Sequence, residues 1–312
     1  MLLAVLLIAG QAAAQPFPHK TIRLISGAPP GTPGDVVARI VAEPLGARLG
    51  QLVIVENRAG AINTIALSAV ARAEADGHTL GILGMPSTVA PSLLASIPYD
   101  TVRDLAAVRQ LSWVSNLLVV RAEAPLGSAA DVVAAAKSRP RELTYASGGN
   151  GTPAHLAAAL WGRHAGIDLR HVPYKGVVAG LAAVLGGQVD MMIAVAPAAL
   201  PQIRAGKLRA LATPAPARLQ ALPEVPTLAE LGYAVDVRDW HGIVAPAATP
   251  KHIVAALDSA LAEVLLRSDV RGRLARVGLE PAESGADAFA SHIRAEVQKW
   301  ARVVSDAGIK PD

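Results

Sequence analysis

The stretch Thr144-Tyr145-Ala146-Ser147-Gly148-Gly149-Asn150-Gly151-Thr152-Pro153-Ala154-His155 predicts a short strand that runs through a loop of small residues into a helix. Residues 143–146 have strand character, and the glycines allow positive φ and a close approach of a ligand to the main chain. Thr152 is a helix-capping residue type, and Pro153 suits a first helical turn. The helix N-terminus would therefore offer its amides to a carboxylate or a phosphate.

The same arrangement occurs earlier in the chain. Residues 22–26 have the pattern of a strand, residues 27–34 form a loop rich in glycine and proline, and Asp35 opens a helix. Two such units predict two α/β lobes, each of which points a helix N-terminus at one cleft. Glycine-rich turns between a strand and a helix are common, so for each stretch an ordinary turn and a ligand-binding loop are both open interpretations.

Strand and helix patterns alternate along the rest of the chain, which predicts a mostly parallel sheet in each lobe. Further strands are expected at residues 52–55, 79–83, 117–121, 169–174, 189–195, 208–212 and 235–244. Further helices are expected at residues 64–73, at 131–137 with Ser128 as the cap, at 180–185, at 253–265 and at 289–304.

Composition limits the possible functions. The chain of 312 residues is long enough for two domains, and 52% of its residues are hydrophobic against 17% charged. The net charge of +4 is scattered, with no Lys/Arg run and no interleaved aromatic residues, which disfavours nucleic-acid binding. The apolar residues 177–200 contain Asp190 and Pro197, so a helix, a turn and a buried strand are favoured over a membrane span.

The N-terminus has the pattern of a secretory signal peptide. Residues 2–9 are apolar, and Ala12 and Ala14 fit cleavage after residue 14, which assigns residues 1–14 to the signal. The apolar run is too short to span a bilayer, although no Lys or Arg precedes Lys20. The sequence contains no cysteine, so it offers neither a disulfide nor a lipid-attachment thiol. We therefore expect an exported soluble protein.

Short motifs follow one another in a defined order along the chain. They include Pro29-Pro30-Gly31, Val55-Glu56-Asn57-Arg58, Pro98-Tyr99-Asp100, Gly148-Gly149-Asn150-Gly151, His171-Val172-Pro173-Tyr174-Lys175-Gly176, Gly186-Gly187-Gln188-Val189-Asp190 and Trp240-His241-Gly242. In this order and spacing the set resembles the Bug family, the extracytoplasmic solute receptors related to the receptors of tripartite tricarboxylate transporters. The resemblance spans essentially the whole mature chain.

The resemblance implies a type II periplasmic binding protein of the α/β class, whose two lobes enclose a ligand cleft and are linked by two crossings of the chain. Lobe one would comprise residues 15–118 and 240–312, and lobe two residues 119–239. Loops from both lobes would hold a small carboxylated ligand through main-chain amides, small hydroxyls and bridging waters. Carried over by position, the ligand-binding residues would be Pro30, Gly31, Thr32, Pro33, Gly34, Asp35, Ser87, Thr88, Ser147, Gly149, Asn150, Gly151, Thr152, His155 and Asp190.

The resemblance also implies a periplasmic receptor of a Gram-negative bacterium, without cofactor or metal. It would deliver a small organic acid to the membrane permease subunits of a tripartite tricarboxylate-type transporter. The same fold can present its closed surface to a sensor kinase, and the sequence does not separate transport from sensing. For single residues other roles are open: Asp35 and Asp190 could act as caps or in ion pairs, and His155 could pack.

The chain departs from the family pattern around the expected cleft. The departures are Gly34 in place of a hydroxyl residue, Ile62 and Asn63 within a glycine-rich run, Ala90 in place of Asn, and Ala194-Val195 in place of a polar pair. These changes make the cleft less polar. They predict a ligand with one carboxylate and an apolar or aromatic body.

An enzyme is the other class of protein to be weighed. The sequence has no His-Glu-x-x-His zinc motif, no Gly-x-Ser-x-Gly elbow and no Walker motif, and its glycine-rich loop is not a dinucleotide fingerprint. Ser147 and His155 are close in sequence, but no third group accompanies them. Catalysis is therefore disfavoured.

Overall fold

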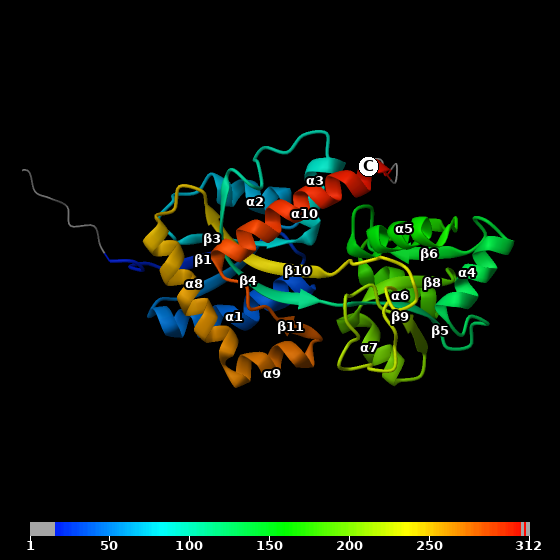
Figure 1. The fold of residues 1–312 in the computed structure, drawn as a ribbon. Coiled ribbons are helices and arrows are strands. Elements are labelled where there is room, and N and C mark those ends of the chain that lie inside the picture. Colours follow the sequence, from blue (N-terminus) through cyan, green and yellow to red (C-terminus); the bar gives the residue numbers. More distant parts are fainter. Residues whose placement is uncertain (1–15, 307–308, 310–312) are drawn as a thin grey trace, which may run out of the picture.

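The computed structural model describes residues 16–306 and residue 309, and it has two α/β lobes side by side (Figure 1). Each lobe is built on its own sheet, so the predicted two-lobed α/β fold is confirmed. The signal peptide expected at residues 1–14 lies outside the described residues. Within the described ranges, no helix combines the length and the apolarity needed to cross a bilayer.

The first lobe contains a six-stranded sheet in the order β11-β4-β10-β3-β1-β2. Its strands are β1 (Ile22–Ser26), β2 (Val53–Asn57), β3 (Thr79–Gly84), β4 (Leu105–Val114), β10 (Asp239–Pro246) and β11 (Leu279–Pro281). Its helices are α1 (Pro33–Leu49), the 3-10 turn η1 (Ala61–Asn63), α2 (Thr64–Ala71), α3 (Met85–Leu93), α8 (Lys251–Leu266), α9 (Ser268–Arg276) and α10 (Ala286–Asp306). One core lies under α1, α8 and α9, and α2, α3 and α10 cover the other face.

The second lobe contains a five-stranded sheet in the order β7-β6-β8-β5-β9. Its strands are β5 (Asn116–Arg121), β6 (Thr144–Ser147), β7 (Arg170–Pro173), β8 (Met191–Val195) and β9 (Leu208–Ala212). Its helices are α4 (Ala129–Ser138), α5 (Pro153–Ala165), α6 (Val177–Leu185) and α7 (Ala196–Arg204). The predicted cap of α4 is confirmed, because Ser128 Oγ accepts the amide of Asp131 at 3.1 Å.

Both sheets are mixed, so the expectation of mostly parallel sheets is wrong. β1 pairs with β2 and β3 in parallel, and β6 pairs with β7 and β8 in parallel. β10 runs antiparallel to β3 and β4, and β5 runs antiparallel to β8 and β9. Each antiparallel pair includes one of the strands that carry the chain between the lobes. The alternation of strands and helices along the sequence does not indicate in which direction these strands pair.

The chain crosses between the lobes at two neighbouring places. Ser115, between β4 and β5, makes the first crossing, and the return leads into β10 at Asp239. Leu117 and Leu118 already pair with β8 in the second sheet, although the predicted boundary assigns residues up to 118 to the first lobe. The division of the chain at those residue numbers stays a prediction.

α10 packs across the first sheet and reaches the second lobe (Figure 1). The Phe289 ring occupies the space where Gly242 has no side chain, and the fully buried Trp240 packs edge-on against it at 5.5 Å between centroids. Burying a side chain of this size contributes roughly 1.5–3 kcal/mol. At the far end of α10, Asp306 lies 3.5 Å from Arg163 of α5.

Candidate functional site

The first predicted loop connects β1 to α1 and is organised by Asp35. This carboxylate is 2% exposed; it accepts the amide of Gly31 at 2.9 Å and the Asn57 side-chain amide at 2.8 Å, and it pairs with Arg39 at 3.0 Å. Burial alone would raise the pKa of Asp35, but these hydrogen bonds hold it below its ordinary value. Asp35 therefore holds the loop in place and has its charge balanced by Arg39.

The N-cap of α5 differs from the expectation, and α1 begins in the same way. Thr32 and Thr152 occupy the N-cap positions, but neither side chain caps its helix. Each hydroxyl instead donates backwards, from Thr32 to Pro29 O and from Thr152 to Gly149 O, both at 2.7 Å. The prediction that Thr152 caps its helix is therefore wrong, since its hydroxyl fixes the preceding loop.

Ser87 and Thr88, which the resemblance places among the ligand-binding residues, lie in the first turn of α3. Both side chains are fully buried. Ser87 Oγ accepts the side-chain amide of Asn63 at 3.2 Å, and Thr88 Oγ1 donates to Met85 O at 2.7 Å. Pro86 stands at the start of the same helix, where its fixed φ suits a first turn.

Residues 61–63 form a strained turn beside this helix. Ala61, Ile62 and Asn63 have φ of 43°, 52° and 67°, in the left-handed region that favours glycine. Ile62 and Asn63 are the two positions where the sequence interrupts the expected glycine-rich run. Asn63 is held between Ser87 and Gly27, since a Cβ on Gly27 would lie 2.8 Å from Asn63. The strained turn therefore places the amide side chain of Asn63 between the loop that follows β1 and the first turn of α3.

The second predicted loop, after β6, is held by Ser147. Its hydroxyl accepts the amide of Gly149 at 3.1 Å, donates to Gly149 O at 3.0 Å, and lies 2.6 Å from His171 Nε2. Gly149 and Gly151 have φ of 125° and 73°, as the glycine pattern predicts. Asn150, half-buried between them, stands at the tip of this loop.

His155 supports the same loop from the first turn of α5. Its Nδ1 accepts the amide of Gly151 at 3.2 Å, and its ring stacks on His171 at 4.1 Å with an interplanar angle of 9°. Tyr145 stacks on the His171 ring at 4.8 Å. Because Nδ1 accepts a hydrogen bond, the proton of the neutral ring is on Nε2. His155 therefore combines packing with positioning of the loop amide.

The loop edges of the two lobes touch at Gly151. A Cβ on this residue would overlap Leu93 Cδ1 of α3 and lie 3.7 Å from Val89 Cγ1. Gly151 therefore allows the second loop to pack against a helix of the first lobe. The structure thus brings the second loop together with α3, the helix whose first turn contains Ser87 and Thr88.

Asp190 lies apart from this region. Its carboxylate accepts the amide and the hydroxyl of Thr144, both at 2.7 Å, at the start of β6. The glycine-rich loop follows the other end of the same strand. Asp190 therefore joins the amino-terminal ends of two strands, and the structure does not place it beside the other predicted site residues.

Sequence analysis assigns no site role to two buried polar residues at the lobe junction. Asn116 begins β5 and His241 lies in β10, and both side chains are buried.

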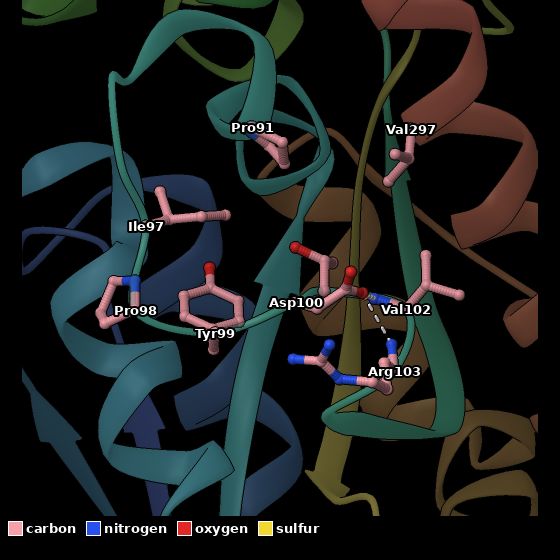
Figure 2. A pocket seen from close by; sticks show the side chains of 9 residues that line it. Pro91, Ile97, Pro98, Tyr99, Asp100, Val102, Arg103 and Val297 are labelled. Carbon is pink, nitrogen blue, oxygen red and sulfur yellow. Dashed lines mark hydrogen bonds between the residues drawn. The ribbon is translucent and has the colours of Figure 1, made fainter.

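A separate surface groove of about 480 Å³ lies on the first lobe, between the segment 97–103, Pro91 of α3 and Val297 of α10 (Figure 2). It contains none of the predicted site residues. Among the described residues, no group of three or more His, Asp or Glu side chains could hold a metal ion.

Two lobes on separate mixed sheets, joined by two crossings and each carrying a glycine-rich loop before a helix, define the class of two-lobed periplasmic solute-binding proteins. The sequence pattern of the family described as tripartite tricarboxylate transporter family receptor matches residues 37–309. The chain therefore belongs to this family. The resemblance to the Bug family is confirmed as well. The protein BugT of Bordetella pertussis is 37% identical to this chain over 97% of it and 94% of BugT.

Solved structures agree with this assignment. An R. palustris protein solved with adipate has 33% identity and a TM-score of 0.85, with 95% of this chain and 100% of that chain covered. MatC from Rhodopseudomonas palustris, solved with bound malate, has 32% identity and a TM-score of 0.80, with 92% and 100% covered. The chain is a solute-binding receptor and not an enzyme.

Proposed function

We propose that this receptor captures a small carboxylate between its two lobes in the periplasm, after removal of residues 1–14, and delivers it to the membrane subunits of a tripartite tricarboxylate-type transporter. The family description favours transport over the sensor-kinase role that the sequence leaves open. The ligand contacts would be Pro30 to Asp35 in the first loop, the turn with Ser87 and Thr88, and, at the second loop, Ser147, Gly149 to Thr152 and His155.

One observation carries the proposal: each loop before a helix N-terminus is held in shape by its own side chains. Asp35 fixes the first loop through the amide of Gly31, and Ser147 fixes the second through both main-chain groups of Gly149. A loop that is already ordered loses little entropy when a ligand binds. An anion at such a helix end is stabilised by about 0.3–1 kcal/mol, and by up to about 2 kcal/mol where it is partly buried.

The relatives support a carboxylate ligand. The two R. palustris proteins were solved with adipate and with malate, and each shares about a third of its residues with this chain. Asp35 does not oppose such a ligand, because its charge is paired with Arg39. Closure would bring the loops of both lobes onto one carboxylate, and the closed surface would be the form that the membrane subunits recognise.

The test is a thermal-shift screen of the protein from Gln15 onward against mono-, di- and tricarboxylates, aromatic acids and amino acids. A ligand at a hundredfold excess over its Kd stabilises the native state by about 2.7 kcal/mol. The protein is first unfolded and refolded to remove any co-purified ligand. A shift with an acid supports the proposal, and the absence of a shift with every acid contradicts it.

A matched pair of variants locates the site. Ser147→Ala removes the hydroxyl that fixes the second loop, whereas Ser128→Ala removes a hydroxyl of the same lobe that caps α4. Each loss is expected to cost about 1 kcal/mol of stability. Only Ser147→Ala should weaken acid binding in calorimetry. Equal binding by both variants would place the ligand elsewhere.

A further inference from the structure

Two stacked histidines lie beside the second loop, residues 148–152 between β6 and α5. The rings of His155 and His171 are 4.1 Å apart between centroids and nearly parallel, with an interplanar angle of 9°. His155 comes from the first turn of α5, and His171 comes from β7, where it pairs with Tyr145 of β6. The resemblance places His155 among the ligand-binding residues, whereas His171 occurs only as part of a motif.

The hydrogen positions around Ser147 follow from its distances. Ser147 Oγ lies 3.0 Å from Gly149 O, and two oxygens at that separation need a hydrogen between them. A carbonyl carries none, so the single hydroxyl hydrogen of Ser147 is donated to Gly149 O. His171 Nε2 lies 2.6 Å from the same hydroxyl oxygen and must then supply its own hydrogen. His171 is therefore in a form that carries a hydrogen on Nε2.

The hydroxyl of Ser147 is fully used in this arrangement. It accepts hydrogens from His171 Nε2 at 2.6 Å and from the amide of Gly149 at 3.1 Å, and it donates its own to Gly149 O. A hydroxyl has one hydrogen and two lone pairs, and this orientation satisfies all three partners. His171 thus restrains the rotation of the hydroxyl, and the hydroxyl restrains the main chain of Gly149.

His155 acts on the other side of the loop tip. Its Nδ1 accepts the amide of Gly151 at 3.2 Å. Gly149 and Gly151 both have positive φ, and a glycine exchanges such a conformation for others at little steric cost. The two histidines therefore restrain the two glycines that flank Asn150, one through Ser147 and the other directly.

We propose that His171 is a positioning residue of the ligand loop. The hydrogen that its Nε2 donates keeps Ser147 in the orientation that fixes Gly149, while His155 fixes Gly151, so that Asn150 is presented in one place. This inference rests on the proposed function, in which the second loop contacts the bound acid. A loop that is held on both sides of its tip loses less entropy when the acid binds, so the hydrogen bond from His171 raises the affinity without touching the acid.

The experiment separates the hydrogen bond of His171 from the packing of its ring. His171→Phe keeps a flat ring in the stack and removes the donor, whereas His171→Gln removes the ring and can place an amide N–H at the position of Nε2. His78→Phe is the matched control. His78 is also buried, accepts the amide of His19 at 3.3 Å and contacts its ring, but it precedes β3, at the end of the first sheet that is remote from the loops.

Two quantities are measured for each protein. The first is the exchange rate of the Gly149 and Gly151 amide hydrogens in the free protein, by NMR. The second is the affinity, by calorimetry, for the acid that gives the largest shift in the thermal-shift panel. His171→Phe should speed exchange at Gly149, leave Gly151 at the wild-type rate, and weaken acid binding about two- to tenfold, which corresponds to one ordinary hydrogen bond.

His171→Gln should recover most of the affinity and of the Gly149 protection that His171→Phe loses, and His78→Phe should match the wild type in both. In a Ser147→Ala background, His171→Phe should have no further effect on affinity, because its action passes through that hydroxyl.

The opposite ranking, with His171→Phe like the wild type and His171→Gln impaired, would show that the ring only packs and would overturn this inference alone. If His171→Phe does not fold, fast Gly149 exchange in His171→Gln overturns it equally. A wild type that binds no acid overturns the proposed function, whereas the exchange rates still decide whether His171 positions the loop.

Discussion

A buried carboxylate on α10 bonds to β10, the strand on which the chain returns from the second lobe. Removing this carboxylate is the sharpest test of what holds β10 to α10. Glu296 is 6% exposed, and its Oε2 accepts the indole N–H of Trp240 at 3.1 Å and of Trp300 at 2.8 Å. Trp240 is the second residue of β10, directly after the chain returns from the second lobe. Lys299 pairs with the other oxygen at 3.3 Å and donates to Asp236 O at 2.9 Å.

The substitution Glu296→Leu leaves two buried indole N–H groups without an acceptor. Each orphaned donor costs about 1–3 kcal/mol, so a loss of about 2–6 kcal/mol of unfolding free energy is expected. The exposed end of the Lys299 interaction adds little. Because domains of this kind are stable by only about 5–15 kcal/mol, the variant should unfold well below the wild type. Glu296→Gln keeps a carbonyl acceptor of the same shape and should lose clearly less.

Urea unfolding followed by tryptophan fluorescence measures this difference. Two of the four tryptophans of the chain bond directly to Glu296, so the folded signal should also change in Glu296→Leu. Glu263→Leu is the control, since it removes an exposed carboxylate paired with Arg48 and should cost at most about 1 kcal/mol. The reasoning is refuted if Glu296→Leu is as stable as Glu296→Gln or as the control.

Two further predictions concern the loop contact and the pH dependence. Gly151→Ala should raise the radius of gyration measured by X-ray scattering, because the methyl group overlaps Leu93 only when the lobes are together. Gly166→Ala carries similar strain at φ 64° with nothing within 4 Å, so it should lower stability by about 1–2 kcal/mol and keep the wild-type size; equal sizes for all three proteins would contradict the contact. Burial lowers the pKa of His292 below its ordinary 6.5, so the unfolded chain binds more protons and stability falls as the pH drops through 6.5. His292→Phe should therefore show a smaller fall in Tm between pH 7.5 and 5 than the wild type, and an equal or larger fall would count against this assignment.

The parts of the fold that the sequence predicts are those with local signals. β1 with α1, and β6 with α5, each combine a short apolar strand, at least one loop glycine with positive φ and a proline in the first helical turn. These features act within about ten residues, so periodicity and turn chemistry suffice to place them. The same locality explains why both loops of the candidate site follow from sequence.

The parts that sequence analysis misses depend on contacts between distant segments. β4 has buried polar residues, Gln110 and Ser112, and register shifts against β10, so its apolar residues do not alternate. Asn116 and His241 reach their buried places through strand pairing, with Val195 and with Gly84 and Ser112 respectively. Asp190 directly precedes β8, and its carboxylate bonds to Thr144, 46 residues away, at the amino-terminal end of β6. No pattern within one segment reports such partners.

The strengths of the contacts along α10 indicate where the lobes can separate. The bonds from Glu296 to the two indoles are buried, whereas the pair between Arg163 and Asp306 joins the lobes through side chains that are 49% and 59% exposed. An exposed pair contributes about 0–1 kcal/mol, less than either buried bond. Opening should therefore break the outer contact first and leave Trp240 fixed on the first lobe. The backbone rotation is then confined to Ser115 and to the residues just before Asp239, the two places where the chain leaves one sheet for the other.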